Sequence, residues 1–318
     1  MTTFIIRRLL QSIVIILLVT IAVFLCMRLL PGDPIFMLYS PSELQTFTEE
    51  ELDAIRRQAG LDKPLPVQYF SWIGGVFRGD LGKSIMFDFT VSSEMAKRIP
   101  VSAYIGSIAF ILGTILGVSF GVISAIKRGT WIDSLVTTLA NVGITVPTFW
   151  LGVMLIFFFA IDLRWLPVMG FTNPFTDFWD STRKLVMPII CMVIPGLAGY
   201  ARYTRSSMLE VLRQDYIRTA WSKGLRQRVV IMKHAMKNGL IPIVTLTGMG
   251  IGGILGGSVM IEQVFNIPGM GRLAVEAMFT HDYAITQGLT LVFTGIVIFS
   301  NLLVDISYGW LDPRIRFN

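Results

Sequence analysis

The chain is 318 residues long, with 53% hydrophobic and only 15% charged residues and a mean hydropathy of +0.65. This composition indicates an integral membrane protein and excludes an ordinary soluble domain. The formal net charge of +6 does not indicate nucleic-acid binding, because excess Lys and Arg in a membrane protein record its topology and no base-reading motif accompanies them. Cys26 and Cys191 lie inside apolar segments, so neither a disulfide nor a zinc site is expected.

Six segments are apolar over the length of about 20 residues that a spanning helix needs. They cover roughly residues 9–30, 101–126, 134–160, 185–204, 240–262 and 285–309. The first apolar run is too long for a signal-peptide core and is expected to remain as an anchor. We therefore expect an all-α fold with six transmembrane helices. Its parts would be an N-terminal helix (1–30), an external subdomain (31–99), a membrane core (100–309) and a C-terminal tail (310–318).

Lys and Arg are distributed unevenly between the two sides of this six-helix arrangement. The short loops on one side hold Arg164, Arg183, Lys184 and Arg272. The other side holds Arg7, Arg8, Lys127, Arg128, a basic stretch within 202–238, Arg314 and Arg316. The long segment 31–99 is exempt, because long loops cross a membrane largely regardless of charge. The positive-inside rule therefore predicts that both termini and the stretch 202–238 are cytoplasmic.

The outer segment 31–99 is expected to be ordered. Thr48 and Glu51 have the spacing of a capping box, and Gly60 is a stop signal for the helix that they would begin. The narrow apolar stripe of that helix is Leu52, Ile55 and Ala59. A second stretch is typical of a helix at the level of the lipid headgroups and contains Tyr69, Phe70, Trp72, Ile73, Val76 and Phe77. The subdomain could cover helix ends or bind a partner, and the sequence leaves both roles open.

Glycines recur every four residues in the second and fifth spans, which indicates close helix packing. They are Gly113, Gly117 and Gly121, then Gly248, Gly252 and Gly256. A glycine-rich helix can also line a solute pathway, although packing is the favoured interpretation. The residues that we predict as candidate pathway lining lie in the third and fifth spans: Asn141, Thr145, Pro147, Thr245, Met249, Gly252 and Gly256.

Charges embedded in the membrane would mark an ion-driven carrier or a proton relay. Only Asp305 has such a position, and near the cytoplasmic end it is expected to pair with a basic residue or a helix end. An intramembrane hydrolase is disfavoured, because no suitable set of catalytic residues shares one depth. The sequence thus predicts a pathway whose energy comes from another subunit.

The basic stretch 202–238 is the clearest functional signal. Its cations are Arg202, Arg205, Arg213, Arg218, Lys223, Arg226, Arg228, Lys233 and Lys237, against Glu210 and Asp215. Residues 206–222 are predicted to form one helix that Gly224 ends, with an apolar side made of Leu209, Leu212, Tyr216, Ala220 and Lys223. Such a helix, displayed toward the cytoplasm, would suit a soluble partner. The alternative is a solvated positive-inside loop, which explains neither the apolar side nor the glycine.

The same stretch resembles the cytoplasmic loop of permease subunits in ATP-binding-cassette (ABC) importers. The resemblance runs from Asp215 to Gly224 and on through His234, Asn238 and the pair Ile241-Pro242. In that family the pattern is Glu-Ala-Ala, three residues and Gly. Here Arg218 and Thr219 replace the Glu and the first Ala, whereas Ala220 and Gly224 match.

That departure is expected of the peptide and nickel branch, whose first permease subunit the rest of the chain also resembles. The similar segments are Leu29-Leu30-Pro31-Gly32-Asp33-Pro34, residues 60–65, 79–84 and 204–208, Pro268-Gly269-Met270-Gly271-Arg272, and residues 311–316. These segments occur in the order of the family and on the sides of the membrane that the topology requires. Together they cover essentially the whole chain.

The resemblance implies the transmembrane domain of a type I ABC importer in a bacterial cytoplasmic membrane. It implies as partners a second, related permease, two ATPase subunits that bind ATP and Mg, and an external solute-binding protein. The coupling helix would comprise Asp215, Tyr216, Ile217, Arg218, Thr219, Ala220, Lys223 and Gly224. No cofactor is expected in this chain, because it has no phosphate-binding glycine loop ending in Lys-Ser or Lys-Thr.

The expected function is that of a non-catalytic permease subunit for oligopeptides or dipeptides. The same machine could instead carry nickel chelates or glutathione-like peptides. A secondary carrier or channel that works alone is the alternative from a different class, and inverted repeats, which would favour it, are not evident.

Overall fold

The computed structural model describes residues 2–29, 47–58, 62–84, 86–256 and 259–311. All the regular elements among these residues are helices. Four of them are long and apolar enough to cross a membrane, and two sharply bent helix pairs would bring the number of crossings to six. The expected all-α membrane fold is therefore confirmed, while two of the six predicted spans are not straight helices.

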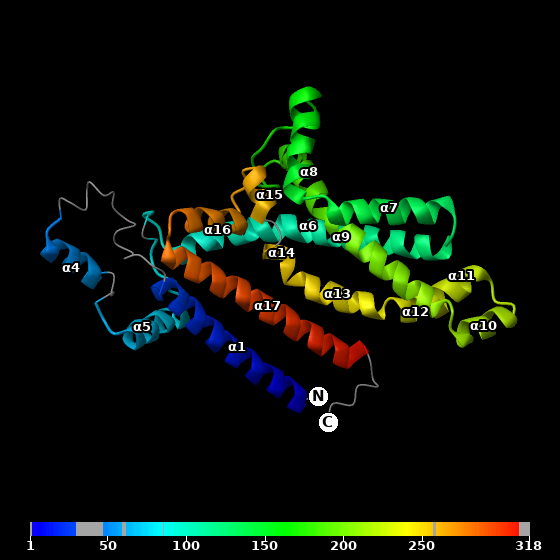
Figure 1. The fold of residues 1–318 in the computed structure, drawn as a ribbon, viewed down its shortest axis with the longest axis horizontal. Helices are drawn as coiled ribbons and strands as arrows, with labels where there is room; N and C mark the ends of the chain where they lie inside the picture. Colours follow the sequence, from blue (N-terminus) through cyan, green and yellow to red (C-terminus); the bar gives the residue numbers. More distant parts are fainter. Residues whose placement is uncertain (1, 30–46, 59–61, 85, 257–258, 312–318) are drawn as a thin grey trace.

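The first and last long helices lie side by side. α1 (Thr2–Leu29) packs along α17 (Tyr283–Leu311), and Figure 1 shows the start of α1 close to the end of α17. Arg8 Nε lies 3.2 Å from Asp305 Oδ2 in this pair. The prediction that Asp305 pairs with a basic residue is thus confirmed.

The centre of the fold is the packing of α6 (Val91–Ile126) against α9 (Phe178–Val211). A Cβ added at Gly117 would lie 2.6 Å from the carbonyl oxygen of Leu197, and one at Gly121 would lie 2.6 Å from that of Ala201. Only glycine allows two helix backbones to approach so closely. The predicted packing role of the first glycine repeat is confirmed. α6 also begins at Val91, well before the expected residue 101.

The predicted third span, 134–160, is wrong as one continuous helix. α7 (Trp131–Thr145) ends before Pro147, and α8 (Thr148–Leu155) with the π-helix η1 (Ile156–Asp162) turns away at 100°. Figure 1 shows this second half projecting from the bundle. The residue before a proline is disfavoured in the helical region, and Val146 is accordingly extended, with φ −70° and ψ 122°. Proline therefore breaks this helix rather than merely kinking it.

The predicted fifth span, 240–262, is also wrong as one helix. α13 (Ile241–Ile251) ends before Gly252, and α14 (Gly253–Gly256) and α15 (Val259–Val264) follow it. Glycine is a poor helix former, so its clustering here weakens the helix. The missing side chain of Gly106 on α6 lets the backbone of Ile254 pack directly against it. α16 (Met270–Phe279) then leads back to α17.

The outer segment contains the two predicted helices. α4 (Glu49–Gln58) begins with the expected capping box, in which the Thr48 N–H donates to Glu51 Oε2 at 2.8 Å and the Glu51 N–H donates to Thr48 Oγ1 at 3.3 Å. The hydrogen bonds from the Thr48 backbone and hydroxyl lower the pKa of Glu51, because they favour its charged form. The predicted stop at Gly60 and the stripe residue Ala59 lie outside the described residues.

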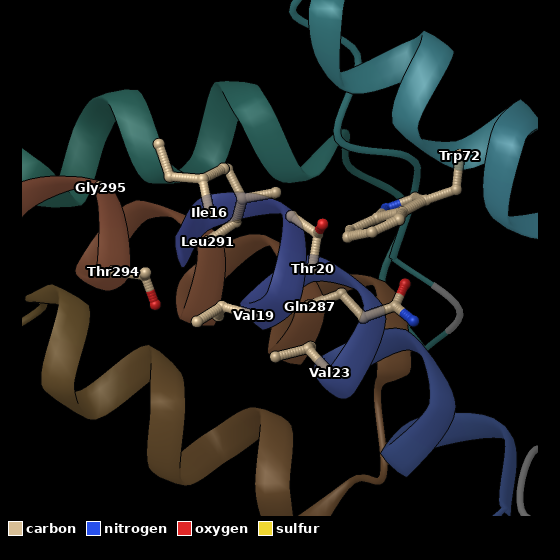
Figure 2. Close-up of a pocket in the computed structure, with 9 residues that line it drawn as sticks. All are labelled: Ile16, Val19, Thr20, Val23, Trp72, Gln287, Leu291, Thr294 and Gly295. Atoms are coloured by element: carbon tan, nitrogen blue, oxygen red, sulfur yellow. The ribbon is translucent and has the colours of Figure 1, made fainter. Parts of the chain in front are cut away.

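α5 (Leu65–Phe77) carries the predicted aromatic residues and packs on the outer part of α1. The Tyr69 ring meets the Phe24 ring edge to face at 5.5 Å, and Thr20 Oγ1 lies 2.9 Å from the Tyr69 hydroxyl. Figure 2 shows Trp72 over Thr20, beside a pocket between α1 and α17. The volume of this pocket is about 50 Å³, too small for a ligand of peptide size, so it is a packing feature.

Candidate coupling surface and translocation pathway

The basic stretch 202–238 is mostly helical. α9 continues to Val211, a turn follows, and a separate helix, α10, spans Asp215–Ser222. The chain returns through α11 (Gln227–Val229), the π-helix η2 (Val230–Ala235) and α12 (Met236–Gly239). The prediction of one helix over 206–222 is therefore wrong. The N–H groups of Arg213 and Gln214 bond the carbonyls of Glu210 and Val211, three residues back, which tightens the last turn of α9 and ends it.

Two buried residues pack α10 against the rest of the protein. Ile217 is completely buried and Ala220 is 6% exposed. They belong to an apolar cluster, called here the α10 base, whose other buried members are Ala125 of α6, Met208 of α9, and Val230, Ile231 and Ala235 of η2. A displacement of α10 would therefore press on the C-terminal ends of α6 and α9.

The exposed face of α10 carries aromatic and charged side chains. Tyr216 is 41% exposed and Trp221 is 43% exposed, and Arg218 and Lys223 are also exposed. The Tyr216 hydroxyl accepts a hydrogen bond from Asn238 Nδ2 at 2.8 Å. The predicted apolar side is thus wrong at Tyr216 and Lys223, and Ile217 supplies the buried position instead. Trp221 is not among the residues predicted for the coupling helix, although an exposed tryptophan on a short polar helix is typical of an interface.

Gly224 ends the turn after α10 with a backbone that favours glycine. Its φ is +73°, in the left-handed region, and its N–H bonds the carbonyl of Trp221 at 2.9 Å. A side chain here would cost about 1 to 2 kcal/mol in backbone strain. The predicted stop at Gly224 is confirmed.

The candidate pathway residues of the third span lie on an open face of α7. Asn141 and Thr145 are exposed, as is Pro147 just after α7, and Thr138 and Ser134 are exposed one and two turns before Asn141. Positions 134, 138, 141 and 145 follow helical spacing and form one polar stripe, called here the α7 stripe. The opposite face of α7 packs through Ala140 and Gly143 against α9.

The candidates of the fifth span have mixed surroundings. Met249 is 59% exposed, whereas the Thr245 hydroxyl bonds the Ile241 carbonyl of its own helix. A Cβ at Gly252 would touch Val297 of α17, and one at Gly256 would meet open space. α13 packs mainly on α17 while α7 packs on α9 and α6, and Figure 1 shows α9 running between α7 and α13. The structure therefore does not bring the two sets of candidates together within this chain.

A cavity of about 260 Å³ lies between the central helices. It is lined by Gly106, Phe110 and Gly113 of α6, Thr148 of α8, Pro195 and Tyr200 of α9, and Gly250 and Gly253 at the break of the fifth span, among others. Gly250 and Gly253 thus border this space, whereas Gly248 and Gly252 of the second glycine repeat pack against Val304 and Val297 of α17.

A buried carboxylate that the sequence did not single out connects α15 with α6 and α16. Glu262 of α15 is completely buried; its Oε1 accepts from Ser102 Oγ at 2.6 Å and its Oε2 accepts from the Arg272 N–H at 2.9 Å. Ser102 Oγ also accepts from the Met270 N–H at 2.8 Å. Glu262 thus neutralises the N-terminus of α16, where a negative charge is favourable. This role was not predicted, because Glu262 lies at the end of a segment that the sequence predicts to be an apolar span.

Comparison with protein families gives two matches that together cover nearly the whole chain. Residues 1–103 match the N-terminal part, and residues 117–317 match the main part, of the binding-protein-dependent transport system inner membrane component. The chain belongs to this family. It is therefore a multi-pass inner-membrane permease subunit of an ABC transporter, a class that works with ATPase and substrate-binding partners.

Several curated relatives of this permease match it from end to end. A peptide permease protein of Brucella suis biovar 1 is 41% identical over 99% of both chains. The peptide ABC transporter permease y4tP of Sinorhizobium fredii is 40% identical, and the oligopeptide transport system permease AppB of Bacillus subtilis is 38% identical, each over 100% of both chains.

Among solved structures, the permease resembles a chain of the MetNI methionine ABC transporter in an inward-facing conformation. The TM-score is 0.54 at 15% identity, over 69% of this chain and 96% of that one. The likeness confirms the type I ABC importer fold that the sequence predicted.

Proposed function

We propose that this permease forms half of the translocation pathway of an ATP-driven, binding-protein-dependent importer of oligopeptides or dipeptides. The full-length similarity to permeases named for peptide transport carries the proposal. A second, related permease would complete the pathway, two ATPase subunits would bind ATP and Mg, and an external binding protein would deliver the peptide. The chain itself would be non-catalytic and hold no cofactor. Both termini and α10 would face the cytoplasm, as the distribution of Lys and Arg predicts.

α10 would be the helix that couples ATP hydrolysis to transport. Its buried residues, Ile217 and Ala220, fix it to α6, α9 and η2, while Tyr216, Trp221 and Arg218 remain available to an ATPase subunit. Aromatic and Arg side chains on a rigid helix are the residues that most often dominate the energy of an interface. α10 would thus offer exposed side chains to the partner, while its buried side chains attach it to the membrane core.

The α7 stripe would line the pathway. Polar side chains that face lipid are costly, whereas polar side chains that face a water-filled passage are satisfied. In a chain that encloses only half of the passage, such residues must be exposed, as Asn141 and Thr145 are. In α13, Met249 is exposed in the same way, while Gly252 is occupied in packing against α17.

Reconstitution of the importer with its ATPase subunits and binding protein tests the coupling role. Trp221→Ala should leave the permease folded in the membrane but weaken ATPase binding by about 1 to 4 kcal/mol, since hot-spot residues have effects of this size. Ala220→Glu and Gly224→Val should abolish peptide-stimulated ATP hydrolysis. Lys97→Ala, at an exposed position on the opposite end of α6, is the control. Normal coupled uptake in all three variants, or peptide uptake without ATP, would refute the proposal.

Thiol labelling tests the pathway assignment in a protein whose Cys26 and Cys191 are replaced by Ser. Cysteines at 138, 141 and 145 should react with a membrane-impermeant reagent and be protected by a transported peptide. A cysteine at Leu139, on the apolar side of the same helix, should react only with a lipid-soluble reagent. Equal behaviour of both sets would show that the stripe faces lipid or protein.

The cargo can be tested by competition for uptake in the reconstituted importer. The names of the relatives favour peptides over nickel chelates, so competition by unlabelled dipeptides and oligopeptides should reduce uptake, whereas a nickel chelate should not. Competition by the chelate alone would change the cargo and leave the coupling mechanism intact.

A further inference from the structure

An ion pair and the groups hydrogen-bonded to it connect three helices next to the α10 base. Asp133, in the first turn of α7, is 6% exposed. Arg205 of α9 binds it through two parallel hydrogen bonds, Nε to Oδ1 at 2.7 Å and Nη2 to Oδ2 at 2.9 Å. Ser124 Oγ of α6 donates to Oδ1 at 2.5 Å, and the Gly129 N–H donates to Oδ2 at 3.0 Å. We call this arrangement the Asp133 clamp.

The clamp lies next to the residues on which α10 rests. Ser124 directly precedes Ala125, and Arg205 lies one helical turn before Met208, and both Ala125 and Met208 belong to the α10 base. Ser207, between Arg205 and Met208, donates its hydroxyl to the Gly239 carbonyl at 2.7 Å. The ends of α6 and α9 are therefore fixed to each other and to α10 within a few residues.

The rest of α7 is attached less firmly. Its buried contacts with α9 are small, through Ala140 against Ala198 and Ala201, and through Gly143. An apolar groove of about 470 Å³ runs along this contact, lined by Leu139 and Ala140 of α7, Leu151 of α8 and Ile194 of α9, among others. The bidentate charged bonds of the clamp are directional, whereas these apolar contacts are not, so the clamp fixes the position of α7 most specifically.

A buried ion pair is weak evidence for stability, because the desolvation of both charges offsets their attraction. Its advantage is a fixed geometry, which the fork of Arg205 on both carboxylate oxygens of Asp133 provides. This geometry suits a connection that must keep one arrangement while helices move together.

We propose that the Asp133 clamp is the connection through which a displacement of α10 reaches α7 and moves the α7 stripe. Asp133 and Arg205 are then positioning residues of the transport cycle. The inference rests on the proposed coupling role of α10 and on the proposed pathway role of α7. Without the clamp, α10 would still drive α6 and α9, but α7 would not follow.

The test measures peptide transported per ATP hydrolysed by the complete importer in proteoliposomes. Arg205→Lys keeps the charge and loses the bidentate fork, Asp133→Asn loses the charge, and Ser124→Ala removes one donor. Each should lower the ratio, with ATP hydrolysis continuing, by about two- to thirtyfold, the range expected for residues that carry coupling. Asp180→Asn is the matched control, because it removes an ion pair with Lys184, at 2.7 Å, at the far end of α9.

A second measurement follows the distance between α7 and α9, first with the clamp intact and then with Arg205 replaced. Spin labels are placed at the exposed positions 131 on α7 and 203 on α9. With the clamp intact, the distance between the two labels should be the same with and without ATP. In Arg205→Lys, that distance should change or its distribution should broaden. A distance that changes with ATP while the clamp is intact would overturn the inference. So would a normal ratio of transport to hydrolysis in the assembled variants, or a loss that only follows the amount of assembled complex.

The α10 variants separate the two proposals. If Trp221→Ala and Gly224→Val uncouple the importer but the clamp variants do not, only the role of the clamp is refuted. If the α10 variants transport normally, the coupling assignment itself fails.

Discussion

The two ends of α6 are held in contrasting ways. At the outer end, Ser102 joins Glu262 and the N-terminus of α16, and every group in this contact belongs to the chain and is buried. At the other end, Ser124 joins Asp133 and Arg205, whose side chain is 30% exposed, beneath a helix with an open aromatic face. The contact at Ser102 is enclosed by this chain alone, whereas the one at Ser124 lies beside exposed side chains that the proposed coupling role assigns to a partner.

The chemistry of the two carboxylates fits this difference. Glu262 is bound by a hydroxyl and a backbone N–H at a helix N-terminus, which are fixed dipoles that stay with the fold. Asp133 is bound by a full positive charge from another helix, as a connection between moving parts requires. Changes at the outer end should therefore affect the whole fold, and changes at the α10 end should act locally or on partners.

The largest effect is expected from Ile217→Ala in the α10 base. Removing a completely buried isoleucine side chain costs about 2 to 5 kcal/mol. Because α10 is short and peripheral, this loss should appear as faster hydrogen exchange in residues 215–222, with little change in the melting temperature of the membrane core. Tyr216→Ala, at the adjacent exposed position, should leave the exchange nearly unchanged. Global unfolding by Ile217→Ala would show that α10 is not an independent unit.

Gly269→Ala should disturb the outer end more globally. A Cβ at Gly269 would overlap the carboxyl group of Glu262 and force α15 and α16 apart. Overpacking of this kind costs about 1 to 3 kcal/mol and should lower the melting temperature of the whole permease. Gly253→Ala is the matched control, because a Cβ there meets nothing within 4 Å. Equal melting temperatures for both variants would contradict the tight packing at Glu262.

Ser102→Ala should have a smaller effect at the same place. It removes the acceptor of the Met270 N–H and one donor to Glu262, and lost bonds of buried groups cost about 1 to 3 kcal/mol. We expect a lower melting temperature with normal coupling of the complexes that assemble. Ser93→Ala, whose hydroxyl bonds only within its own first turn, should change stability by less than about 0.5 kcal/mol. Uncoupling by Ser102→Ala would mean that the outer end also transmits motion.

The smallest effect concerns the capping box of α4. The folded pKa of Glu51 is lowered by Thr48, so its stabilising contribution is present above the unfolded pKa and is lost as the pH falls through the folded pKa. In an NMR titration, Thr48→Ala should raise the pKa of Glu51 toward its ordinary value, while Thr48→Ser should preserve the lowered pKa. An unchanged titration in Thr48→Ala would assign the shift to another cause.

Much of the fold follows from local patterns in the sequence. The capping box of Thr48 and Glu51, the stop at Gly224 and the glycine repeat of α6 were all predicted, because each depends on residues within a few turns of one helix. The breaks at Pro147 and Gly252 were less accessible. A proline or a glycine permits either a kink or a complete break, and the choice depends on what the following residues pack against.

The sequence by itself determined the membrane class, the number of apolar segments and the stretch that carries α10, since hydrophobic length and charge are summed along the chain. Only the tertiary structure decided that Ile217 rather than Tyr216 is buried, and that Asp133 meets Arg205 across 72 residues. Burial of a face and pairing of distant charges depend on which helices meet. That contact is made in space and leaves no periodic signal in either segment.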